Sequence, residues 1–223
     1  MQARYERNIP ALSGQECILL KQKSVLVAGC GGLGGHIIEL LARIGIGSII
    51  AVDGDVFDES NLNRQLLSEL SLLGTSKAEA AKERVARINP DVRVRAVHAF
   101  ITEKNAAELI SGCDAVLDAL DSIPARRLLA NACSSAGIPY VYGAIRGWVA
   151  QAAVSMPGDG LIERLYPENV SIRDKSVLSF TPALCASMQA ALCVKLLCGR
   201  PIESGKLYYF DLQDMEAETI PML

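Results

Sequence analysis

The sequence predicts an α/β fold with a mainly parallel sheet, helices on both faces and an antiparallel C-terminal extension. Through the first two thirds of the 223 residues, short apolar runs alternate with stretches of helical period. This alternation is typical of parallel strands joined by helices. After Gly147 the rhythm changes to strands and irregular segments, which favours antiparallel pairing there.

Five strands are expected in the parallel part, because each is a short run of apolar or alternating residues. They cover residues 25–29, 48–53, 92–100, 114–120 and 139–145. The helices between them have a period near 3.6 and are bounded by caps, glycines or Asn-Pro. They cover residues 33–44, Thr75 or Ser76 to about Ile88, 103–110 and 124–136.

The C-terminal part is expected to hold three more strands and a long helix. The strands cover residues 148–156, 206–212 and 216–223, the last two as a hairpin turning near Gln213-Asp214, and the helix covers 183–199. Residues 157–180 have no clear period and are expected to form a loop, which at this length is more often functional than average. Tyr140 and Trp148 are expected to pack against the sheet.

The composition excludes several classes of protein. Half of the residues are hydrophobic but only 5% are aromatic, and the net charge is −3 with a pI near 5.5. A mildly acidic chain without basic runs is a poor candidate for nucleic-acid binding. No signal-like segment opens the sequence, and no apolar stretch approaches the length of a membrane span. We expect a cytoplasmic protein that binds neither membranes nor nucleic acid.

A glycine turn follows the first strand. Gly29, Gly31 and Gly34 have the spacing G-x-G-x-x-G, and Asp53 lies nineteen residues further on, at the end of the second strand. Such a turn lets the backbone approach a phosphate at a helix N-terminus, and the acid accepts hydrogen bonds from ribose. The pattern predicts a Rossmann-like nucleotide site. NAD and ATP both carry this ribose, so the turn leaves the nucleotide open.

The segment after the second strand favours a polyphosphate. Asn61, Asn63, Arg64 and Gln65 lie within five residues, and Lys77 follows thirteen positions after Arg64. Arginine and lysine converging on one ligand suit a triphosphate, whose charge needs more than helix amides to hold it. The alternative is a solvated loop followed by a lysine on a helix surface.

These motifs belong to a wider resemblance. The chain resembles the E1-like activating enzymes typified by the bacterial MoeB, ThiF and HesA proteins, which share a domain with eukaryotic ubiquitin-activating enzymes. The matching segments are "RYERN" at 4–8, "GCGGLGG" at 29–35, "VDGDVFDESNLNRQ" at 52–65, "GTSKAEAAKERVARINPDV" at 74–92, "DAVLDALDS" at 114–122 and "PYVYGAIRGWVAQ" at 139–151. They span nearly the whole chain.

The resemblance implies an activity. Family members catalyse attack of the C-terminal glycine carboxylate of a small ubiquitin-like sulfur carrier on the α-phosphate of ATP, releasing pyrophosphate, in molybdopterin, thiamine or related biosynthesis. It implies one E1/ThiF-type adenylation domain over residues 1–223. Its parts are an N-terminal arm (1–22), a nucleotide-binding half (23–145) and a carrier-binding half (146–223) with a crossover loop at about 156–180.

The resemblance also assigns residues by matching position. The nucleotide site it implies consists of Gly29, Gly31, Gly32, Gly34, Asp53, Asp55, Asn61, Arg64, Gln65, Lys77, Asp121 and Ser122. The catalytic residues it implies are Arg7, Arg64, Lys77 and Asp121, with Asp121 associated with Mg²⁺. Arg7 matches an arginine that reaches into the neighbouring subunit's site, which implies a homodimer. The carrier is expected to end in Gly-Gly.

Two departures from the family pattern carry predictions. Many members bind zinc through two C-x-x-C pairs, but the matching regions read "LIERLYPE" at 161–168 and "YYFDLQDM" at 208–215, so no zinc is predicted. Some members use a cysteine in the crossover loop, where this chain has none. Cys185 is the nearest, and we expect it to be a buried helix residue, which favours adenylation without a covalent enzyme–carrier step.

Three other functions stay open from the sequence. A relative within the family adenylates a carboxylate on a modified tRNA base, as the threonylcarbamoyladenosine dehydratases do. An NAD-dependent oxidoreductase is supported only by the glycine turn and Asp53. A non-catalytic scaffold would keep the fold and bind a carrier without chemistry.

Overall fold

A computed structural model describes residues 2–167 and 176–222. Eight strands form one sheet in the order β3-β2-β1-β4-β5-β6-β7-β8. Their bounds are β1 Ser24–Ala28, β2 Ser48–Val52, β3 Arg93–Val97, β4 Ala115–Asp118, β5 Tyr140–Arg146, β6 Val149–Ser155, β7 Lys206–Asp211 and β8 Glu216–Pro221.

The sheet has a parallel and an antiparallel part. Strands β3, β2, β1, β4 and β5 pair in parallel, and β5 through β8 pair antiparallel. The predicted α/β class with an antiparallel C-terminal extension is therefore confirmed. The exposed outer strand β8 carries Glu216, Glu218 and Pro221, residue types that discourage pairing of a free edge with another chain.

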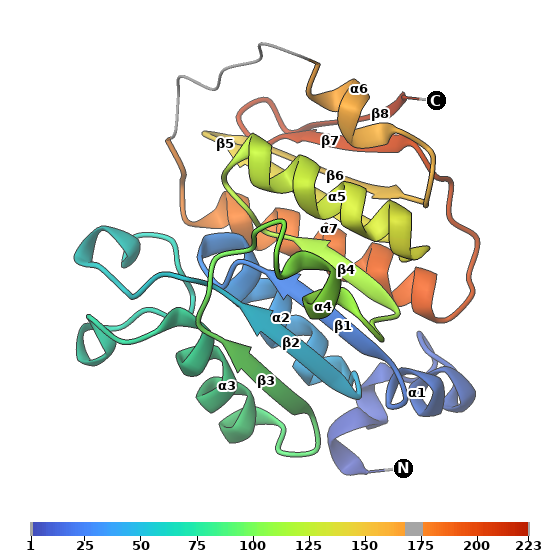
Figure 1. Cartoon of the computed structure of the whole chain (residues 1–223). Helices are drawn as coiled ribbons and strands as arrows, with labels where there is room; N and C mark the ends of the chain where they lie inside the picture. The colour runs from blue at the N-terminus through green and yellow to red at the C-terminus, as the bar shows by residue number, and fades with distance from the viewer. Residues whose placement is uncertain (1, 168–175, 223) are drawn as a thin grey trace.

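Helices cover both faces of the sheet (Figure 1), with α5 in front and α7 behind in that view. The α-helices are α1 Gly14–Leu20, α2 Gly32–Ile44, α3 Lys77–Ile88, α4 Ala106–Ile110, α5 Ile123–Ala136, α6 Leu161–Leu165 and α7 Phe180–Leu197. Three short 3-10 helices are η1 Ala3–Asn8, η2 Glu59–Asn61 and η3 Leu70–Leu72. Side chains of α1, α2, α3 and α7 pack in one apolar cluster, and those of α4, α5 and α6 in the other.

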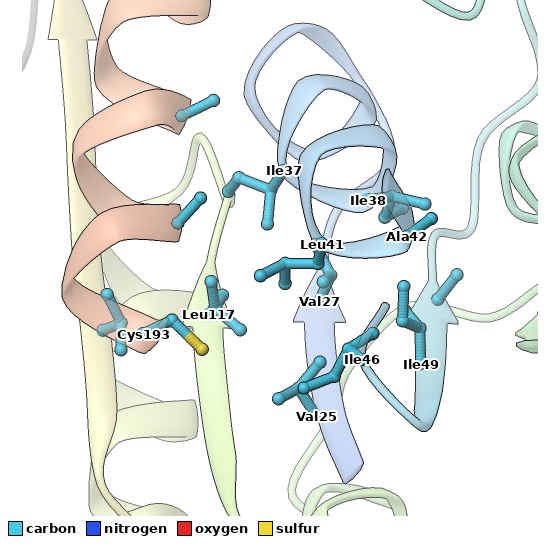
Figure 2. Packing of buried hydrophobic residues seen from close by; sticks show 14 of the residues in the cluster. Val25, Val27, Ile37, Ile38, Leu41, Ala42, Ile46, Ile49, Leu117 and Cys193 are labelled. Carbon is cyan, nitrogen blue, oxygen red and sulfur yellow. The ribbon is translucent and has the colours of Figure 1, made fainter. Parts of the chain in front are cut away.

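The larger cluster fixes α2 between the sheet and α7. Ile37 and Leu41 of α2 lie against the β1 side chain Val27, and Cys193 of α7 approaches Leu117 of β4 (Figure 2). All five residues are fully buried. Because α2 begins at the end of β1, this packing also fixes the place of the glycine turn between them.

The long helix α7 belongs to this core. Its length and apolar composition meet the criterion for a membrane-spanning helix, although no such stretch is predicted from the sequence. However, 56% of it is buried within the fold. Its residues pack against α2, β5 and β6. The core helix of a globular fold passes the same test of length and composition.

Two local expectations differ from the structure and a third is confirmed. The expected loop at 157–180 contains the short helix α6, and its residues 168–175 lie outside the described part of the chain. The prediction for Tyr140 is confirmed, since it is 2% exposed. The prediction for Trp148 is wrong. This residue lies at the turn between β5 and β6, is 43% exposed, and its ring meets that of Phe180 at 5.2 Å.

Candidate active site

A cavity of about 440 Å³ opens at the carboxyl ends of the parallel strands. Parallel strands joined by helices bring the segments after each strand to the same edge of the sheet, where ligands bind in open α/β sheets. Ten of the predicted site residues line this cavity: Gly29, Gly31, Gly32, Asp53, Asp55, Asn61, Arg64, Gln65, Lys77 and Asp121.

Two glycines of the turn, Gly29 and Gly34, have no room for a side chain. Gly29 has a φ of +95°, and a Cβ there would lie 2.7 Å from the carbonyl oxygen of Ala119. A Cβ on Gly34 would overlap the carbonyl oxygen of Gly29. Gly34 does not line the cavity; instead it lets α2 begin directly under the turn. The predicted ligand contact of Gly34 is thus replaced by a packing role.

Asp53 closes the turn from the second strand. One carboxylate oxygen accepts the Cys30 amide at 2.7 Å, and the other accepts the Asp55 amide at 2.8 Å. Each carboxylate oxygen has two lone pairs. Asp53 therefore holds the turn in place and retains acceptor capacity on the side that faces the cavity.

Lys77 is a buried cation whose only ion pair among the described residues is a long one with Asp55. Its side chain is 8% exposed, and its ammonium lies 3.3 Å from the Asp55 carboxylate, which is 57% exposed. Lysine is almost never fully buried without a partner. Because Lys77 lines the cavity, its position favours an anionic ligand there.

Arg64 lies across the cavity mouth from the glycine turn. Its Cγ lies 3.6 Å from the position of a Cβ on Gly32. The guanidinium donates to the Ser60 carbonyl at 2.9 Å and to the Asn63 side chain at 2.8 Å. Both partners are on the same loop, so further donors of the guanidinium stay available.

Asn61 and Gln65 are the buried polar residues of that loop. The Asn61 side chain accepts the Asp58 amide at 3.1 Å, while the buried Oε1 of Gln65 has no hydrogen-bond partner among the described residues. The Gln65 amide also packs on Gly31. A buried acceptor without a partner at a cavity wall is a place where a ligand donor would be stabilised.

The cavity combines a positive electrostatic field from helix N-termini with a partly apolar lining. Helices α2, α3 and α5 all begin at this edge, so the positive ends of their dipoles lie toward it. The rest of the lining includes the apolar residues Val52, Ala99, Phe100, Ile101 and Leu120. Such a cavity suits a ligand with a flat apolar group at one end and several negative charges at the other.

Asp121 lies in the turn between β4 and α5 and lines the cavity. Among the described residues, no group of three or more His, Cys, Asp or Glu side chains is placed to hold a metal ion. Magnesium is usually held by one or two carboxylates together with substrate phosphates, so a single acid here fits Mg²⁺ bound with a polyphosphate. The absence of zinc stays a prediction.

Besides Gly34, two predicted site residues lie outside the cavity. Ser122 is the N-cap residue of α5 and its side chain makes no capping bond. Arg7 is exposed in η1, and η1 packs at the amino ends of the strands, opposite the cavity. There the Asn8 side chain donates to the Ile44 carbonyl, and Tyr5 lies against Gly45, which precedes β2. Arg7 is therefore remote from the cavity of its own chain.

Sequence reasoning missed four cavity-side residues. Asp118 and Arg126 form a fully buried ion pair at 2.7 Å, and Phe100 and Tyr166 line the cavity. Burial raises the pKa of the Asp118 carboxyl, and Arg126 opposes this shift. One signal was available: Asp118 is an acid inside the apolar run "DAVLDAL", and a buried carboxylate requires a partner.

The cysteines take no part in the cavity. Six of the seven are buried and all are free. Cys185 is completely buried in α7, and burial raises its pKa to about 12. Its sulfur lies 3.3 Å from the Gln151 carbonyl. Its expected place as a buried helix residue is confirmed.

Comparison with known proteins gives consistent matches. Residues 5–222 match the ThiF family. The SAMP-activating enzyme E1 of Haloferax volcanii is 38% identical, covering 91% of this chain and 77% of that protein. The molybdopterin-synthase adenylyltransferase of Escherichia coli is 34% identical, covering 99% and 92%.

Other matches extend beyond this chain. The probable adenylyltransferase/sulfurtransferase MoeZ of Mycobacterium tuberculosis is 37% identical over 98% of this chain, which spans 59% of that protein's length. The crystal structure of Escherichia coli MccB with ATP superposes with a TM-score of 0.85 at 22% identity, covering 100% of this chain and 72% of that one. At that identity the likeness concerns the fold.

Proposed function

Because the chain belongs to the ThiF family of E1-like activating enzymes, we propose that it is an adenylyltransferase for a sulfur-carrier protein. In this proposal the terminal glycine carboxylate of a small ubiquitin-like carrier attacks the α-phosphate of ATP. The carrier leaves as an acyl-adenylate, and pyrophosphate is released. A carrier ending in Gly-Gly is the expected substrate.

One observation carries the proposal: Arg64 and Lys77 line the same cavity as the glycine turn. A carboxylate that attacks a polyphosphate meets electrostatic repulsion, which the site must cancel before the atoms meet. Two cations and the N-terminus of α2 supply that charge. NAD carries a diphosphate, which is less negative than the triphosphate of ATP. An NAD-binding oxidoreductase therefore does not account for two cations in this cavity.

The cavity residues suit the parts of ATP. The adenine ring packs against the apolar residues near Phe100 and Ile101, and the Asp53 carboxylate accepts hydrogen bonds from the ribose hydroxyls. The phosphates then extend along the glycine turn toward Arg64 and Lys77. Lys77 exchanges its exposed carboxylate partner for phosphate oxygens, which satisfies a buried ammonium better than a single contact at 3.3 Å.

The chemistry requires positioning rather than a general base. A glycine carboxylate is already ionised at neutral pH, so the protein must hold the nucleophile and the α-phosphate together. We propose that Asp121 holds Mg²⁺ with the phosphates, where the ion supplies further charge cancellation. The chain's own residues fix the ends of the nucleotide and close the site to competing water.

Arg7 enters this proposal through a second copy of the chain. In its own chain it lies at the amino ends of the strands, away from the cavity. Any role in the reaction therefore requires a partner whose cavity faces η1. We propose a homodimer in which each Arg7 completes the site of the other copy.

Two measurements test the proposal. ATP with Mg²⁺, but not NAD, should raise the Tm of the protein, because a ligand that binds only the folded state stabilises it. A purified carrier ending in Gly-Gly should support exchange of radioactive pyrophosphate into ATP. Stabilisation by NAD alone would favour the oxidoreductase.

The same assay separates the remaining alternatives. Pyrophosphate release with tRNA but not with any carrier would transfer the activity to the tRNA-modifying class. A protein that binds ATP and its carrier without exchange would be a scaffold. A carrier truncated before its terminal glycines is the matched control, since it keeps the docking surface and lacks the nucleophile.

A further inference from the structure

Strands β4 and β5 separate at their carboxyl ends, beside the cavity. Their ladder contains only two residue pairs, Val116 with Tyr140 and Leu117 with Val141. Beyond these pairs, a side chain from each helix layer joins the two strands. Gln189 comes from α7 and Arg126 from α5, so the gap is closed from both faces of the sheet.

Hydrogen bonds from these two side chains join β4 and β5 where the backbone ladder ends. The Gln189 amide donates to the carbonyls of Asp118 at 2.8 Å and Val141 at 3.0 Å. The Arg126 guanidinium donates to the Asp118 carboxylate at 2.7 Å and to the Gly143 carbonyl at 2.7 Å. Both side chains are buried, so water does not replace these bonds.

Arg126 also holds the turn that carries Asp121. Its second terminal nitrogen donates to the Leu120 carbonyl, while the Leu120 amide donates to the Asp118 carboxylate at 2.9 Å. Both backbone groups of Leu120 are therefore tied to the Arg126–Asp118 pair. Asp121 is the next residue, and its direction into the cavity depends on this turn.

The other side of Arg126 faces two tyrosines. The guanidinium lies 5.3 Å from the ring centre of Tyr142 and 6.0 Å from that of Tyr166. The two hydroxyls are 2.6 Å apart, and the Gln151 amide donates to Tyr142 at 2.6 Å. Tyr166 and Arg126 both line the cavity. Arg126 thus connects the turn after β4 with the wall formed by β5 and Tyr166.

We propose that Arg126 is a positioning residue for adenylation: it sets the direction of Asp121 and the width of the cavity between β4 and β5. This inference rests on the proposed function. The geometry requires an arginine, because three acceptors from different segments lie around one planar fork. A lysine at this position keeps the ion pair with the Asp118 carboxylate. Its single ammonium does not also reach the Leu120 and Gly143 carbonyls.

Arg126→Lys is the first test. We expect ATP to raise the Tm of this variant in the absence of Mg²⁺ as it does for the wild type, while the additional rise caused by Mg²⁺ is lost. The pyrophosphate exchange rate should fall by roughly 10²-fold, the effect of a misplacement of about 1 Å in a reacting site. Arg84→Lys is the matched control, because Arg84 of α3 makes a bidentate pair with Glu39 of α2, away from the cavity.

A second variant separates positioning from folding. Arg126→Lys keeps the charge of the pair, whereas the double variant Asp118→Asn/Arg126→Gln removes both charges and leaves no unpaired ion. Circular dichroism and Tm establish that the double variant is folded. We expect it to show the same loss of Mg²⁺ response and of exchange.

The outcomes are distinct. One outcome overturns the inference: the variants fold, their ligand-free Tm is lower than that of the wild type, and they keep the wild-type Mg²⁺ response and exchange rate. Arg126 is then only structural. If the wild type neither gains stability from ATP nor exchanges pyrophosphate with any carrier, the proposed function fails and the inference fails with it.

Discussion

Lys77 and Asn89 lie at opposite ends of the same helix, α3, and both are buried, yet their partners differ. Among the described residues, the Lys77 ammonium meets one exposed carboxylate at 3.3 Å. The Asn89 side chain donates to the Tyr5 hydroxyl at 2.8 Å and to the Ala42 carbonyl at 2.6 Å, and accepts from Arg4 at 2.6 Å. The Lys77 ammonium has one long contact, whereas both polar atoms of the Asn89 side chain have hydrogen-bond partners.

The two edges of the sheet therefore differ in how their buried polar groups are satisfied. At the carboxyl edge, buried polar groups with spare capacity surround a cavity, as at Lys77 and Gln65. At the amino edge, Asn89 uses both amide donors and its side-chain oxygen to fix the N-terminal arm. Leaving a buried polar group unsatisfied costs about 1–3 kcal/mol, so the carboxyl edge is stabilised when a ligand arrives. The amino edge needs no ligand.

The largest expected effect concerns Arg7, which lies at the amino edge and, in the proposed homodimer, reaches the cavity of the other copy. If Arg7 acts on the cavity of a second copy, Arg7→Ala lowers pyrophosphate exchange by roughly 10³-fold, the lower range for an arginine supplied in trans. The Tm should stay unchanged, because Arg7 is exposed and makes no hydrogen bond or ion pair to another described residue. Exchange within a few-fold of wild type would remove Arg7 from the mechanism.

A mixing experiment sharpens this prediction. Arg7→Ala and Arg64→Ala copies are each inactive alone, but a mixed dimer has one site with both arginines intact. At a one-to-one mixture, half of the dimers are mixed, so about a quarter of wild-type activity should return. No recovery, with subunit exchange shown by a tagged copy, would place both arginines on one chain.

The next effect lies at the carboxyl edge. Arg64→Ala should lower exchange by about 10²–10³-fold, as loss of one charge-stabilising donor does, and abolish the rise in Tm caused by ATP. The fold should persist, because the Arg64 guanidinium bonds only to groups of its own loop. Arg200→Ala is the matched control, since its exposed guanidinium pairs with Glu16 in α1. Equal losses in both variants would indicate a non-specific charge effect.

A smaller effect, on stability alone, tests the amino edge. Asn89→Ala leaves the Tyr5 hydroxyl, the Ala42 carbonyl and the Arg4 guanidinium without their shared partner, at a cost of about 3 kcal/mol. At about 2–4 °C for each kcal/mol, the Tm falls by roughly 6–12 °C. The rise in Tm caused by ATP should be retained.

Asn131→Ala is the control for this substitution, because Asn131 is exposed on α5 and such changes are usually within about 0.5 kcal/mol. If Asn89→Ala removed the ATP response as well, the two edges would be coupled, and their separation would be wrong.

The parallel half of the fold was predictable because its signals are local. The glycines after β1 and the Asn-Pro after α3 each mark a boundary within a few residues, and strand–helix alternation then fixes the layers. Helix α6 was missed because five residues in a charged segment have no detectable period. The strand expected at 92–100 ends at Val97, and Phe100 turns onto Gly54 at the cavity instead.

The candidate site was predictable where neighbouring strands end and not where distant side chains meet. Arg64 and Lys77 follow β2 closely in sequence, so their arrival at one edge follows from the topology. Arg126 and Arg127 are adjacent arginines in a helix, and nothing in the sequence tells which is buried. That depends on the gap between β4 and β5, which Arg126 spans to reach Gly143.

The smallest expected effect concerns Cys185, which lies between the two edges inside α7. Burial raises the pKa of its thiol to about 12, so the thiol stays protonated well above neutral pH and lacks the thiolate that reacts. Cys185→Ser should leave pyrophosphate exchange within about a few-fold of wild type, because the nearest acceptor, the Gln151 carbonyl, accepts equally from a hydroxyl. Alkylation of Cys185 in the folded protein, followed by mass spectrometry, should be much slower than alkylation of the same cysteine in the unfolded protein at every pH between about 7 and 9, because the folded thiol is both buried and protonated. Alkylation at pH 7 as fast in the folded as in the unfolded protein, or a carrier adduct lost in the serine variant, would place a reactive thiolate here and make the core of α7 part of the chemistry.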